Sequence, residues 1–475
     1  MDIVKLNLTE VRDKIAVREL SATEVTRAVF KRIEETKQLN TLITLDEENA
    51  LKTAAEIDAK LASGKSVGAL GGVPIIVKDN ISTRGLRTTC ASKFLENYVP
   101  PFDATVVKKL KDAGAVIVGK ANMDEFAMGS ANENSAFGPV LNAADMTRVP
   151  GGSSGGSASS VAAFQAYGAL GSDTGGSIRQ PAAFCGVVGL KPTYSSVSRY
   201  GLIAFASSLD QIGPMTRSVR DNAELFNVIT GYDDKDSTSS KTSCDFTAYG
   251  AGVKGLSVGV AKEFFEVDFS AEVKEAVLAA LKLYEKMGAS VKEISIKSFD
   301  AALATYYVLS CAEASSNLAR FDGVKYGVRA EADDYVQLYY KSRSAGFGPE
   351  VKRRIMTGNY VLSSGYYDAY YLKASKIRTK IKAEFDAAFE GCDLIAGPTA
   401  PTTAFPLGAK NKDVTESYLA DVFTVPVNII GNPAISVPCG RDKAGLPIGL
   451  QLIGKSFGER TLFAAAEALE KEGCF

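Results

Sequence analysis

Two glycine–serine loops in the middle of the chain constrain its fold more than any other stretch. The first reads P-G-G-S-S-G-G-S over residues 150–157, and the second reads D-T-G-G-S-I-R-Q-P-A over residues 173–182. Glycine lets a backbone approach a ligand closely and adopt dihedral angles that other residues avoid. Successive N–H groups in such a turn form a concavity that binds anions. The two loops therefore predict a nucleophilic serine beside a cradle for a negatively charged oxygen.

A flexible linker and a phosphate-binding loop are the alternative interpretations of these glycine-rich runs. Most Gly/Ser runs are linkers, but this one is short, lies between apolar segments and continues as a small-residue helix over 157–166. No Gly-Lys-Ser/Thr follows the glycines, as a phosphate loop requires. Residues 114–120 do read G-x-x-x-x-G-K, but 115–118 form an apolar strand and Ala121 replaces the required hydroxyl residue. We therefore interpret the loops as catalytic.

The composition of the whole chain excludes several classes of protein. The formal net charge is −1 at pH 7 over 475 residues, whereas a chain that holds RNA or DNA by itself needs a basic face. No apolar run is long enough to span a bilayer, and the charged N-terminus lacks the apolar core of a signal peptide. The seven cysteines contain no C-x-x-C pair, which is typical of reduced thiols. These features predict a cytoplasmic protein without a membrane partner.

Alternating helical and strand-like segments indicate the fold class. Residues 8–37 and 47–63 carry apolar residues at helical spacing, and Ser21 to Glu24 form an expected capping box. Further strands are expected at 73–77, 115–118, 255–260, 290–296, 393–398, 434–438 and 448–453, and further helices at 103–113, 271–287, 299–321, 350–389 and 459–471. This order predicts an α/β fold with a large mixed, mainly parallel twisted sheet, covered by helices on both faces.

The chain contains no histidine, so neither a Ser-His-Asp nor a Cys-His pair can form within it. Lysine is the usual substitute for the missing base. No serine lies three residues before any lysine, which excludes the S-x-x-K arrangement as well. The base must therefore come from another part of the sequence.

Lys78 is the candidate base because it ends the apolar strand 73–77. A lysine at a strand end commonly extends to water, but the carboxyl end of a strand is also where open α/β sheets bind ligands. Burial can lower a lysine pKa by several units from about 10.4. A shift of about three units corresponds to roughly 4 kcal/mol, so nearby hydroxyls must form hydrogen bonds with the amine.

The two loops and the strand lysine together resemble the amidase signature family over almost the whole chain. The resemblance implies the fold of that family and a Ser–cis-Ser–Lys triad. In this sequence Lys78 would be the base, Ser153 the bridging serine and Ser177 the nucleophile. The Gly152–Ser153 peptide bond would be cis.

The resemblance also implies an acyl-transfer mechanism. Neutral Lys78 draws a proton from Ser153, which draws one from Ser177, and Ser177 Oγ attacks an amide carbonyl. Ammonia departs, and water hydrolyses the acyl-enzyme. The oxyanion would be bound by backbone N–H groups of Thr174, Gly175, Gly176 and Ser177. Structural roles within the loops are expected for Ser154, Asp173, Arg179 and Gln180.

Four further stretches, 123–130, 321–327, 350–355 and 421–428, resemble the glutaminase subunits of tRNA-dependent amidotransferases within that family. Glutamine would then be the substrate, with Arg354 on its α-carboxylate and Asp421 on its α-ammonium group. A free amino acid needs one cation and one anion in its pocket, and arginine binds a carboxylate bidentately. Further pocket residues are expected to be Ser130 and either Tyr306 or Tyr307. Without the motif, Arg354 would be interpreted as an exposed helix charge.

The same resemblance implies a heterotrimer in which B and C subunits are the partners and the B subunit makes most of the tRNA contact. No cofactor or metal is expected in this chain, whereas ATP and Mg are expected in the partner subunit. Ammonia would convert Glu-tRNA(Gln) to Gln-tRNA(Gln), and whether Asp-tRNA(Asn) is also served stays open. Two alternatives remain: a stand-alone amidase for another small amide, and a catalytically silent scaffold subunit.

A single domain is expected over residues 1–475. Its parts are an N-terminal helical segment at 1–65, the Ser/Ser/Lys catalytic core at 66–232, a polar surface connection at 233–253, and a C-terminal part at 254–475 that completes the sheet and the glutamine pocket.

Overall fold

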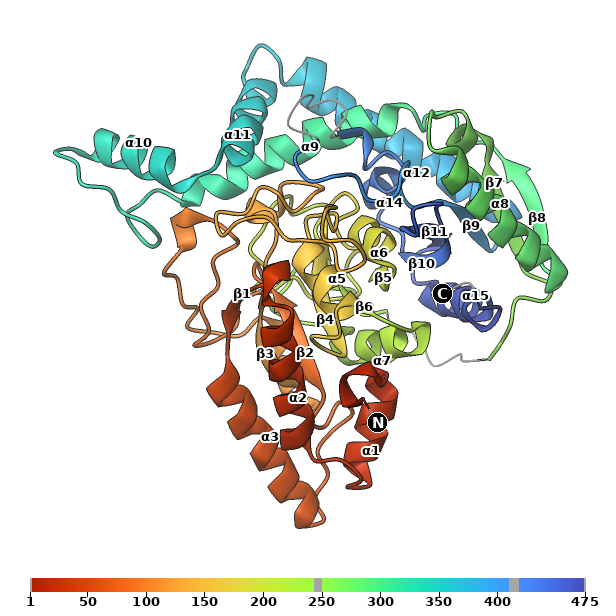
Figure 1. Cartoon of the computed structure of the whole chain (residues 1–475). Coiled ribbons are helices and arrows are strands. Elements are labelled where there is room, and N and C mark those ends of the chain that lie inside the picture. The colour runs from red at the N-terminus through yellow and green to blue at the C-terminus, as the bar shows by residue number, and fades with distance from the viewer. Residues whose placement is uncertain (1, 243–249, 410–417, 474–475) are drawn as a thin grey trace.

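A computed structural model describes residues 2–242, 250–409 and 418–473. Within these ranges eleven strands form one sheet, in the order β1-β3-β2-β4-β6-β5-β10-β11-β9-β7-β8 (Figure 1). The strands are β1 Leu42–Leu45, β2 Pro74–Lys78, β3 Val116–Ala121, β4 Gly168–Asp173, β5 Val188–Lys191, β6 Gln211–Thr216, β7 Ser257–Ala261, β8 Ser290–Ile294, β9 Leu394–Pro398, β10 Ala434–Arg441 and β11 Pro447–Gly454. Part of the expected polar connection, residues 243–249, lies outside the described residues, as do Cys244 and Cys474.

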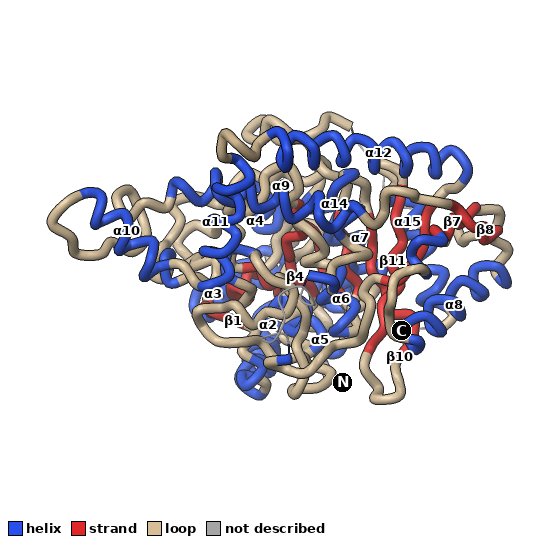
Figure 2. Tube along the Cα trace, turned by 90° about the horizontal axis from the view of Figure 1, so that it is seen from above, coloured by secondary structure: helices blue, strands red, loops and turns tan. Residues whose placement is uncertain are grey.

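Helices lie on both sides of this band of strands (Figure 2). They are α1 Leu8–Ala16, α2 Ala22–Glu35, α3 Glu47–Ala62, α4 Thr105–Asp112, α5 Gly155–Ala162, α6 Arg179–Cys185, α7 Val219–Ile229, α8 Ala271–Lys286, α9 Ala301–Asn317, α10 Tyr335–Gly346, α11 Pro349–Leu362, α12 Lys373–Gly391, α14 Val425–Ile430 and α15 Glu459–Lys471. Helix α10 projects from the body of the molecule in both views. In the three described ranges, no helix combines the length and the apolar character needed to cross a membrane.

The sheet is mixed, as predicted, but the expectation that it is mainly parallel is wrong. Four of the strand pairings in the described ranges are parallel: β2 with β3, β2 with β4, β7 with β8, and β7 with β9. The other six pairings are antiparallel. The difference arises because β6 runs antiparallel between β4 and β5, and because β10 and β11 form an antiparallel pair.

The predicted helix over 8–37 is two helices, α1 and α2. Ser21 caps α2 by accepting a hydrogen bond from the Glu24 amide at 3.0 Å, which is one half of the expected capping box. The complete capping box precedes α1 instead, between Asn7 and Glu10. At α2 the carboxylate of Asp58 accepts the amides of Ala22 and Thr23, which satisfies two further N–H groups of the first turn.

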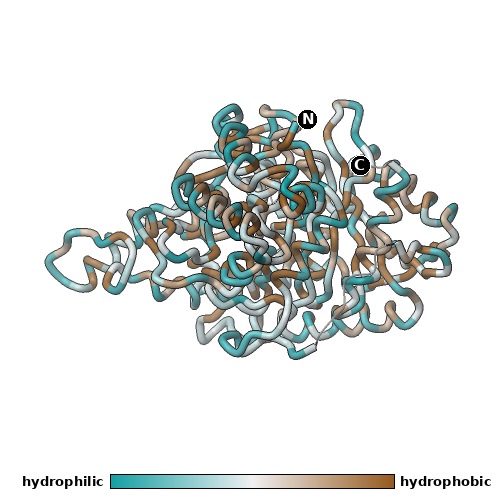
Figure 3. Tube along the Cα trace, turned by 90° about the horizontal axis from the view of Figure 1, so that it is seen from below, coloured by the Kyte–Doolittle hydropathy of each residue, from teal (hydrophilic) through white to brown (hydrophobic). Residues whose placement is uncertain are grey.

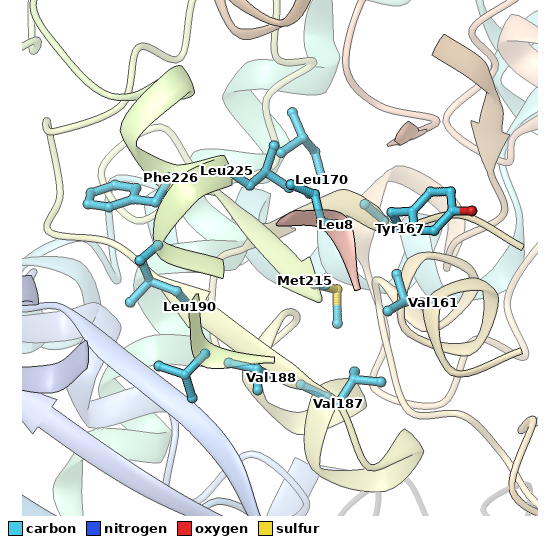
Figure 4. Packing of buried hydrophobic residues seen from close by; sticks show 14 of the residues in the cluster. Leu8, Val161, Tyr167, Leu170, Val187, Val188, Leu190, Met215, Leu225 and Phe226 are labelled. Atoms are coloured by element: carbon cyan, nitrogen blue, oxygen red, sulfur yellow. The ribbon is translucent and has the colours of Figure 1, made fainter. Parts of the chain in front are cut away.

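Hydrophobic segments concentrate inside the body of the molecule (Figure 3). Every residue of β2, β3 and β4 is buried, as expected for strands covered on both faces. Leu170 of β4 packs in a cluster with Met215 of β6 and with Leu225 and Phe226 of α7 (Figure 4). Each such buried side chain contributes roughly 1.5–3 kcal/mol, so the strands that carry the site are firmly held.

Candidate active site

Lys78 lies at the centre of a buried polar cluster. Strands β2 and β4 run parallel with Val77 opposite Leu170, so the carboxyl end of β2 lies beside that of β4. The fully buried Lys78 Nζ is 2.8 Å from Ser153 Oγ, 2.8 Å from Ser154 Oγ and 3.0 Å from Ser172 Oγ. The Ser172 carbonyl oxygen is a fourth neighbour of Nζ, at 3.2 Å.

Burial determines the protonation of this lysine. Removal from water lowers the pKa of Lys78 to about 7, although the carboxylates of Asp124, Asp173 and Asp210 partly oppose the shift. Near neutral pH a large fraction of the amine is therefore uncharged and has a lone pair. An uncharged amine in hydrogen-bond contact with a serine hydroxyl can act as a general base.

The Ser153 loop is held from both sides. The Gly152–Ser153 peptide bond is cis, as predicted. The Gly152 amide donates to Gln180 Oε1 at 3.0 Å, and Gln180 Nε2 donates to the Ser130 carbonyl oxygen at 3.0 Å, which confirms that Gln180 braces the loop. A Cβ on Gly152 would lie 2.0 Å from Asp124 Oδ2. Only glycine therefore fits at this position without displacing the carboxylate.

Asp173 organises the second loop. Its carboxylate accepts hydrogen bonds from the Gly176 amide at 2.8 Å and the Ile178 amide at 3.2 Å, and from two nitrogens of Arg179 at 3.0 Å each. Asn428 Nδ2 donates to the same group at 2.8 Å. Burial opposes its charge, but these partners, led by Arg179, hold the pKa of Asp173 at about 2. The structural roles predicted for Asp173 and Arg179 are confirmed.

The expectation that the Gly176 amide binds the oxyanion is wrong for this structure. That N–H group already donates to Asp173, so it is not directed at a substrate. Across the described part of the chain, no hydrogen bond is found for the amides of Thr174, Gly175 and Ser177. These three amides remain as candidate oxyanion donors.

Ser177 is placed by its backbone. Its carbonyl oxygen accepts a hydrogen bond from the Ser154 amide at 3.1 Å, which joins the two loops, and its side chain is slightly exposed, at 8%. Within the described ranges its Oγ forms no hydrogen bond. The first link of the predicted relay, Lys78 to Ser153, is present at 2.8 Å, whereas the second link, Ser153 to Ser177, stays a prediction.

Two neighbours of the amine have larger roles than the sequence indicated. Ser154, expected to make only a loop hydrogen bond, touches Lys78 Nζ at the same 2.8 Å as Ser153. Ser172 was missed entirely, because the small residues of β4 did not indicate a strand. A strand recognised there would have placed Ser172 beside Lys78 at the common edge of the sheet.

The expected substrate pocket brings Arg354 inside the protein. Its side chain is only 5% exposed, so it is not an exposed helix charge. Its guanidinium lies 5.1 Å from the ring centroid of Tyr307 and 5.6 Å from that of Tyr418. Arg354 Nε donates to Glu350 Oε1 at 2.8 Å, a partner that the sequence analysis did not predict.

The two candidate tyrosines face different parts of the pocket. A Cβ on Gly175 would lie 2.6 Å from the hydroxyl of Tyr306, so Tyr306 covers the second loop. Tyr307 stacks on Tyr418 with 4.0 Å between ring centroids and lies against Arg354. Tyr306 therefore lies beside the second loop and Tyr307 beside the guanidinium.

Asp421 and Ser130 complete the set of predicted pocket residues. Burial raises the pKa of Tyr306 and Tyr307, and the charges of both Arg354 and Asp421 act on each phenol, which places the two charges around the tyrosine pair. Asp421, at 9% exposure, precedes α14 and accepts the Thr424 hydroxyl on its carbonyl oxygen at 3.1 Å. Ser130 is buried next to the braced Ser153 loop. In the described ranges no group of three or more acidic or cysteine side chains is arranged to bind a metal ion.

Comparisons with known proteins show what the whole chain is similar to. The family model named Amidase matches residues 24–463. The A subunit of glutamyl-tRNA(Gln) amidotransferase from Carboxydothermus hydrogenoformans is 56% identical over 99% of this chain and 98% of its own length. The protein of the same name from Caldanaerobacter subterraneus is 55% identical, with 99% and 97% covered. A crystal structure of the protein of this name from Thermotoga maritima is 44% identical, with a TM-score of 0.81 over 99% of this chain and 95% of that one.

Proposed function

The chain belongs to the amidase signature family, and from that premise we propose that it is the glutaminase subunit of glutamyl-tRNA(Gln) amidotransferase. In this role it hydrolyses glutamine and supplies ammonia for the conversion of Glu-tRNA(Gln) to Gln-tRNA(Gln). Full-length relatives that carry the name of this amidotransferase support the assignment. One observation carries the chemistry: a fully buried lysine amine lies 2.8 Å from a serine hydroxyl beside the second serine loop.

The reaction begins with proton transfer toward Lys78. Ser153 gives its proton to the amine and takes the proton of Ser177, whose Oγ forms a bond to the side-chain carbonyl carbon of glutamine. The oxyanion is met by the unoccupied amides of Thr174, Gly175 and Ser177. When the C–N bond breaks, the nitrogen takes the proton back and leaves as ammonia. Water then cleaves the acyl-enzyme ester and yields glutamate.

Substrate selection rests on Arg354 and Asp421. In the described part of the chain only Nε of the Arg354 guanidinium is engaged by a protein acceptor, so its two terminal nitrogens remain for the α-carboxylate of glutamine. The carboxylate of Asp421 supplies the opposite charge for the α-ammonium group. Tyr307 and Tyr418 flank the guanidinium and shield the ion pair from water, while Tyr306 and Ser130 line the pocket toward the two loops.

The name shared by the relatives implies a multi-subunit amidotransferase. Within it, B and C subunits are the partners of this chain, the three forming a heterotrimer, and the B subunit makes most of the tRNA contact. ATP and Mg act in the partner subunit to activate the glutamyl-tRNA, and this chain needs no cofactor of its own. As an enzyme of translation it works in the cytoplasm.

Replacement of Ser177 tests the assignment directly. Ser177→Ala should abolish ammonia release from glutamine. The matched control is Ser160→Ala, because Ser160 is a buried serine of α5 whose hydroxyl bonds only to the Ser157 carbonyl oxygen within the described ranges. That control should retain ammonia release. Unchanged release in Ser177→Ala would leave the chain as a catalytically silent scaffold, and activity on simple amides without activity on glutamine would identify a stand-alone amidase.

A further inference from the structure

Asn80 is a buried polar residue that the mechanism so far does not use. It follows β2 by two positions, in a turn that is closed by the Ile81 amide donating to the Lys78 carbonyl oxygen at 3.0 Å. Asn80 Nδ2 donates to Ser172 Oγ at 2.9 Å, and the same oxygen is 3.0 Å from Lys78 Nζ. Asn80 Oδ1 is buried and has no hydrogen-bond partner among the described residues. The side chain therefore contacts the base through one serine.

The hydrogen bonds around Lys78 favour a neutral amine. A protonated amine donates three hydrogen bonds, whereas a neutral one donates two and accepts one. The Ser154 hydroxyl donates to the Ser172 carbonyl oxygen at 3.1 Å, so it can only accept from the lysine. Ser172 Oγ receives the N–H of Asn80 on one of its two lone pairs, so only the other lone pair is left for a single N–H of the lysine.

We propose that Asn80 is a positioning residue that acts through Ser172 to keep the Lys78 amine neutral and its lone pair directed at Ser153. By donating to one lone pair of Ser172 Oγ, Asn80 limits this oxygen to one N–H of the lysine and makes it a weaker acceptor for an ammonium group. This inference rests on the proposed function, because it assumes that Lys78 is the base.

The charges around the lysine make the neutrality of Asn80 significant. The titratable groups that face Lys78 from neighbouring elements are three carboxylic acids and a thiol, namely Asp124, Asp173, Asp210 and Cys90. The neighbouring Asp79 carboxylate accepts the Thr89 amide on Oδ2 at 2.9 Å, and the lysine charge that acts on it is that of Lys120. An acid in place of Asn80 would add a negative charge one hydrogen-bonded residue from Nζ and would favour the ammonium form.

The test uses the full-length chain and phenylmethanesulfonyl fluoride, which needs no substrate pocket for an amino acid. When Ser177 reacts, the Oγ–S bond forms, the S–F bond breaks, fluoride leaves, and the serine proton passes through Ser153 to Lys78. The labelling rate is measured against pH by intact mass. In Asn80→Asp the midpoint should move up by about one pH unit or more, which is about fivefold slower labelling at pH 7. The rate should recover to within about twofold of the parent at pH 9.

A double-mutant cycle tests the route through Ser172. Asn80→Ala should move the midpoint upward by less than Asn80→Asp, and should cause no further shift when Ser172→Ala is already present. The control is Asn222→Asp, because Asn222 is a buried asparagine that donates to the Val188 and Pro214 carbonyl oxygens and whose Oδ1 has no partner among the described residues. Asn222→Asp should lower the melting temperature without moving the pH midpoint of labelling.

The outcomes separate this inference from the proposed function. Absence of Ser177 labelling in the parent chain would overturn the catalytic assignment itself. Thermal melting first shows whether both Asn80 variants are folded. If both are folded and labelled, but the pH midpoint of labelling is unmoved or lowered in each, the role of Asn80 alone is overturned. If Asn80→Ala and Ser172→Ala shifted the pH midpoint of labelling independently of each other, the role of Asn80 would also be overturned. If Asn80→Asp does not fold, Asn80→Ala and the cycle still decide the matter.

Discussion

Lys78 and Lys120 are two buried lysines on neighbouring parallel strands, and their difference shows what turns a buried amine into a base. In the register of β2 and β3, Val77 lies opposite Lys120 and Lys78 opposite Ala121. Both side chains are fully buried. Burial lowers the pKa of Lys78 to about 7 and that of Lys120 to about 8. Loss of water around the amine therefore acts on both residues in the same direction.

The partners of the two amines separate their roles. Lys78 Nζ contacts the hydroxyls of Ser153, Ser154 and Ser172, which belong to the first loop and to the end of β4. Lys120 Nζ donates to the Ile81 carbonyl oxygen at 2.5 Å and to Thr88 Oγ1 at 2.8 Å, so it fastens the segment that follows β2. Burial in the interior is therefore enough to lower the pKa of a lysine. Whether that lysine acts as a base depends on which hydroxyl groups its amine contacts.

The largest expected effect is on catalysis. Lys78→Met should reduce ammonia release from glutamine by about 1000-fold or more, because loss of a general base costs about 100- to 10,000-fold. Lys120→Met should leave the rate within about tenfold, because its amine meets no group of the loops. Lys78→Arg should be as inactive as Lys78→Met, because arginine stays charged. Circular dichroism shows whether both methionine variants are folded. If they are, and if both lose the same fraction of the ammonia release rate, the two lysines do not differ in their roles.

The pH dependence of the turnover rate shows which of the two amines is the base. Only neutral Lys78 can accept a proton, so the rate should rise with pH and reach half its maximum near the Lys78 pKa of about 7. The difference in rate between pH 6 and pH 8 should be roughly tenfold. Lys120→Met should show the same midpoint. A midpoint that follows Lys120 instead, moving when that residue is replaced, would contradict the assignment of the base.

The sequence predicted the base and the two loops because these features are local. An apolar strand that ends in lysine, an absence of histidine and two glycine–serine runs are all visible without a structure. The amidase resemblance added the roles of Ser153 and Ser177 and the cis bond. By contrast, β4 and β6 read G-A-L-G-S-D and Q-I-G-P-M-T, and glycine and proline weaken any strand prediction.

Long-range contacts account for what was missed. Gly213 of β6 is required because a Cβ there would lie 2.0 Å from the Leu190 carbonyl oxygen, a closeness that only the assembled sheet imposes. Without β4 and β6, neither Ser172 nor the antiparallel centre of the sheet could be predicted. Glu350 precedes Arg354 by one helical turn, but only burial of the helix face makes this pair a part of the pocket. The use of the Gly176 amide by Asp173 depends likewise on folded geometry.

Stability against pH offers a smaller, thermodynamic test. The folded-state pKa of Lys120, about 8, lies below its unfolded value of about 10.4, so between these values the unfolded chain binds the extra proton. The contribution of Lys120 to the free energy of unfolding is therefore lowest below pH 8 and increases with pH up to about 10.4. Compared with Lys120→Met, the parent should gain roughly 1 kcal/mol of unfolding free energy per pH unit between about pH 8.5 and 9.5. If the free energies of unfolding of the parent and of Lys120→Met changed equally with pH over that range, Lys120 would not be a neutral, buried amine.

The smallest effect isolates a single hydroxyl. Thr88→Val removes an acceptor 2.8 Å from Lys120 Nζ and should lower the unfolding free energy by about 1 kcal/mol, because a buried donor is left unsatisfied. Thr26→Val is the matched control, since Thr26 Oγ1 is buried in α2 and has no partner in the described ranges. That variant should be neutral or slightly stabilising, because it removes an unsatisfied polar atom. If urea denaturation gave equal losses for both, the Thr88 hydroxyl would not be what holds Lys120, and its contacts would not distinguish it from Lys78.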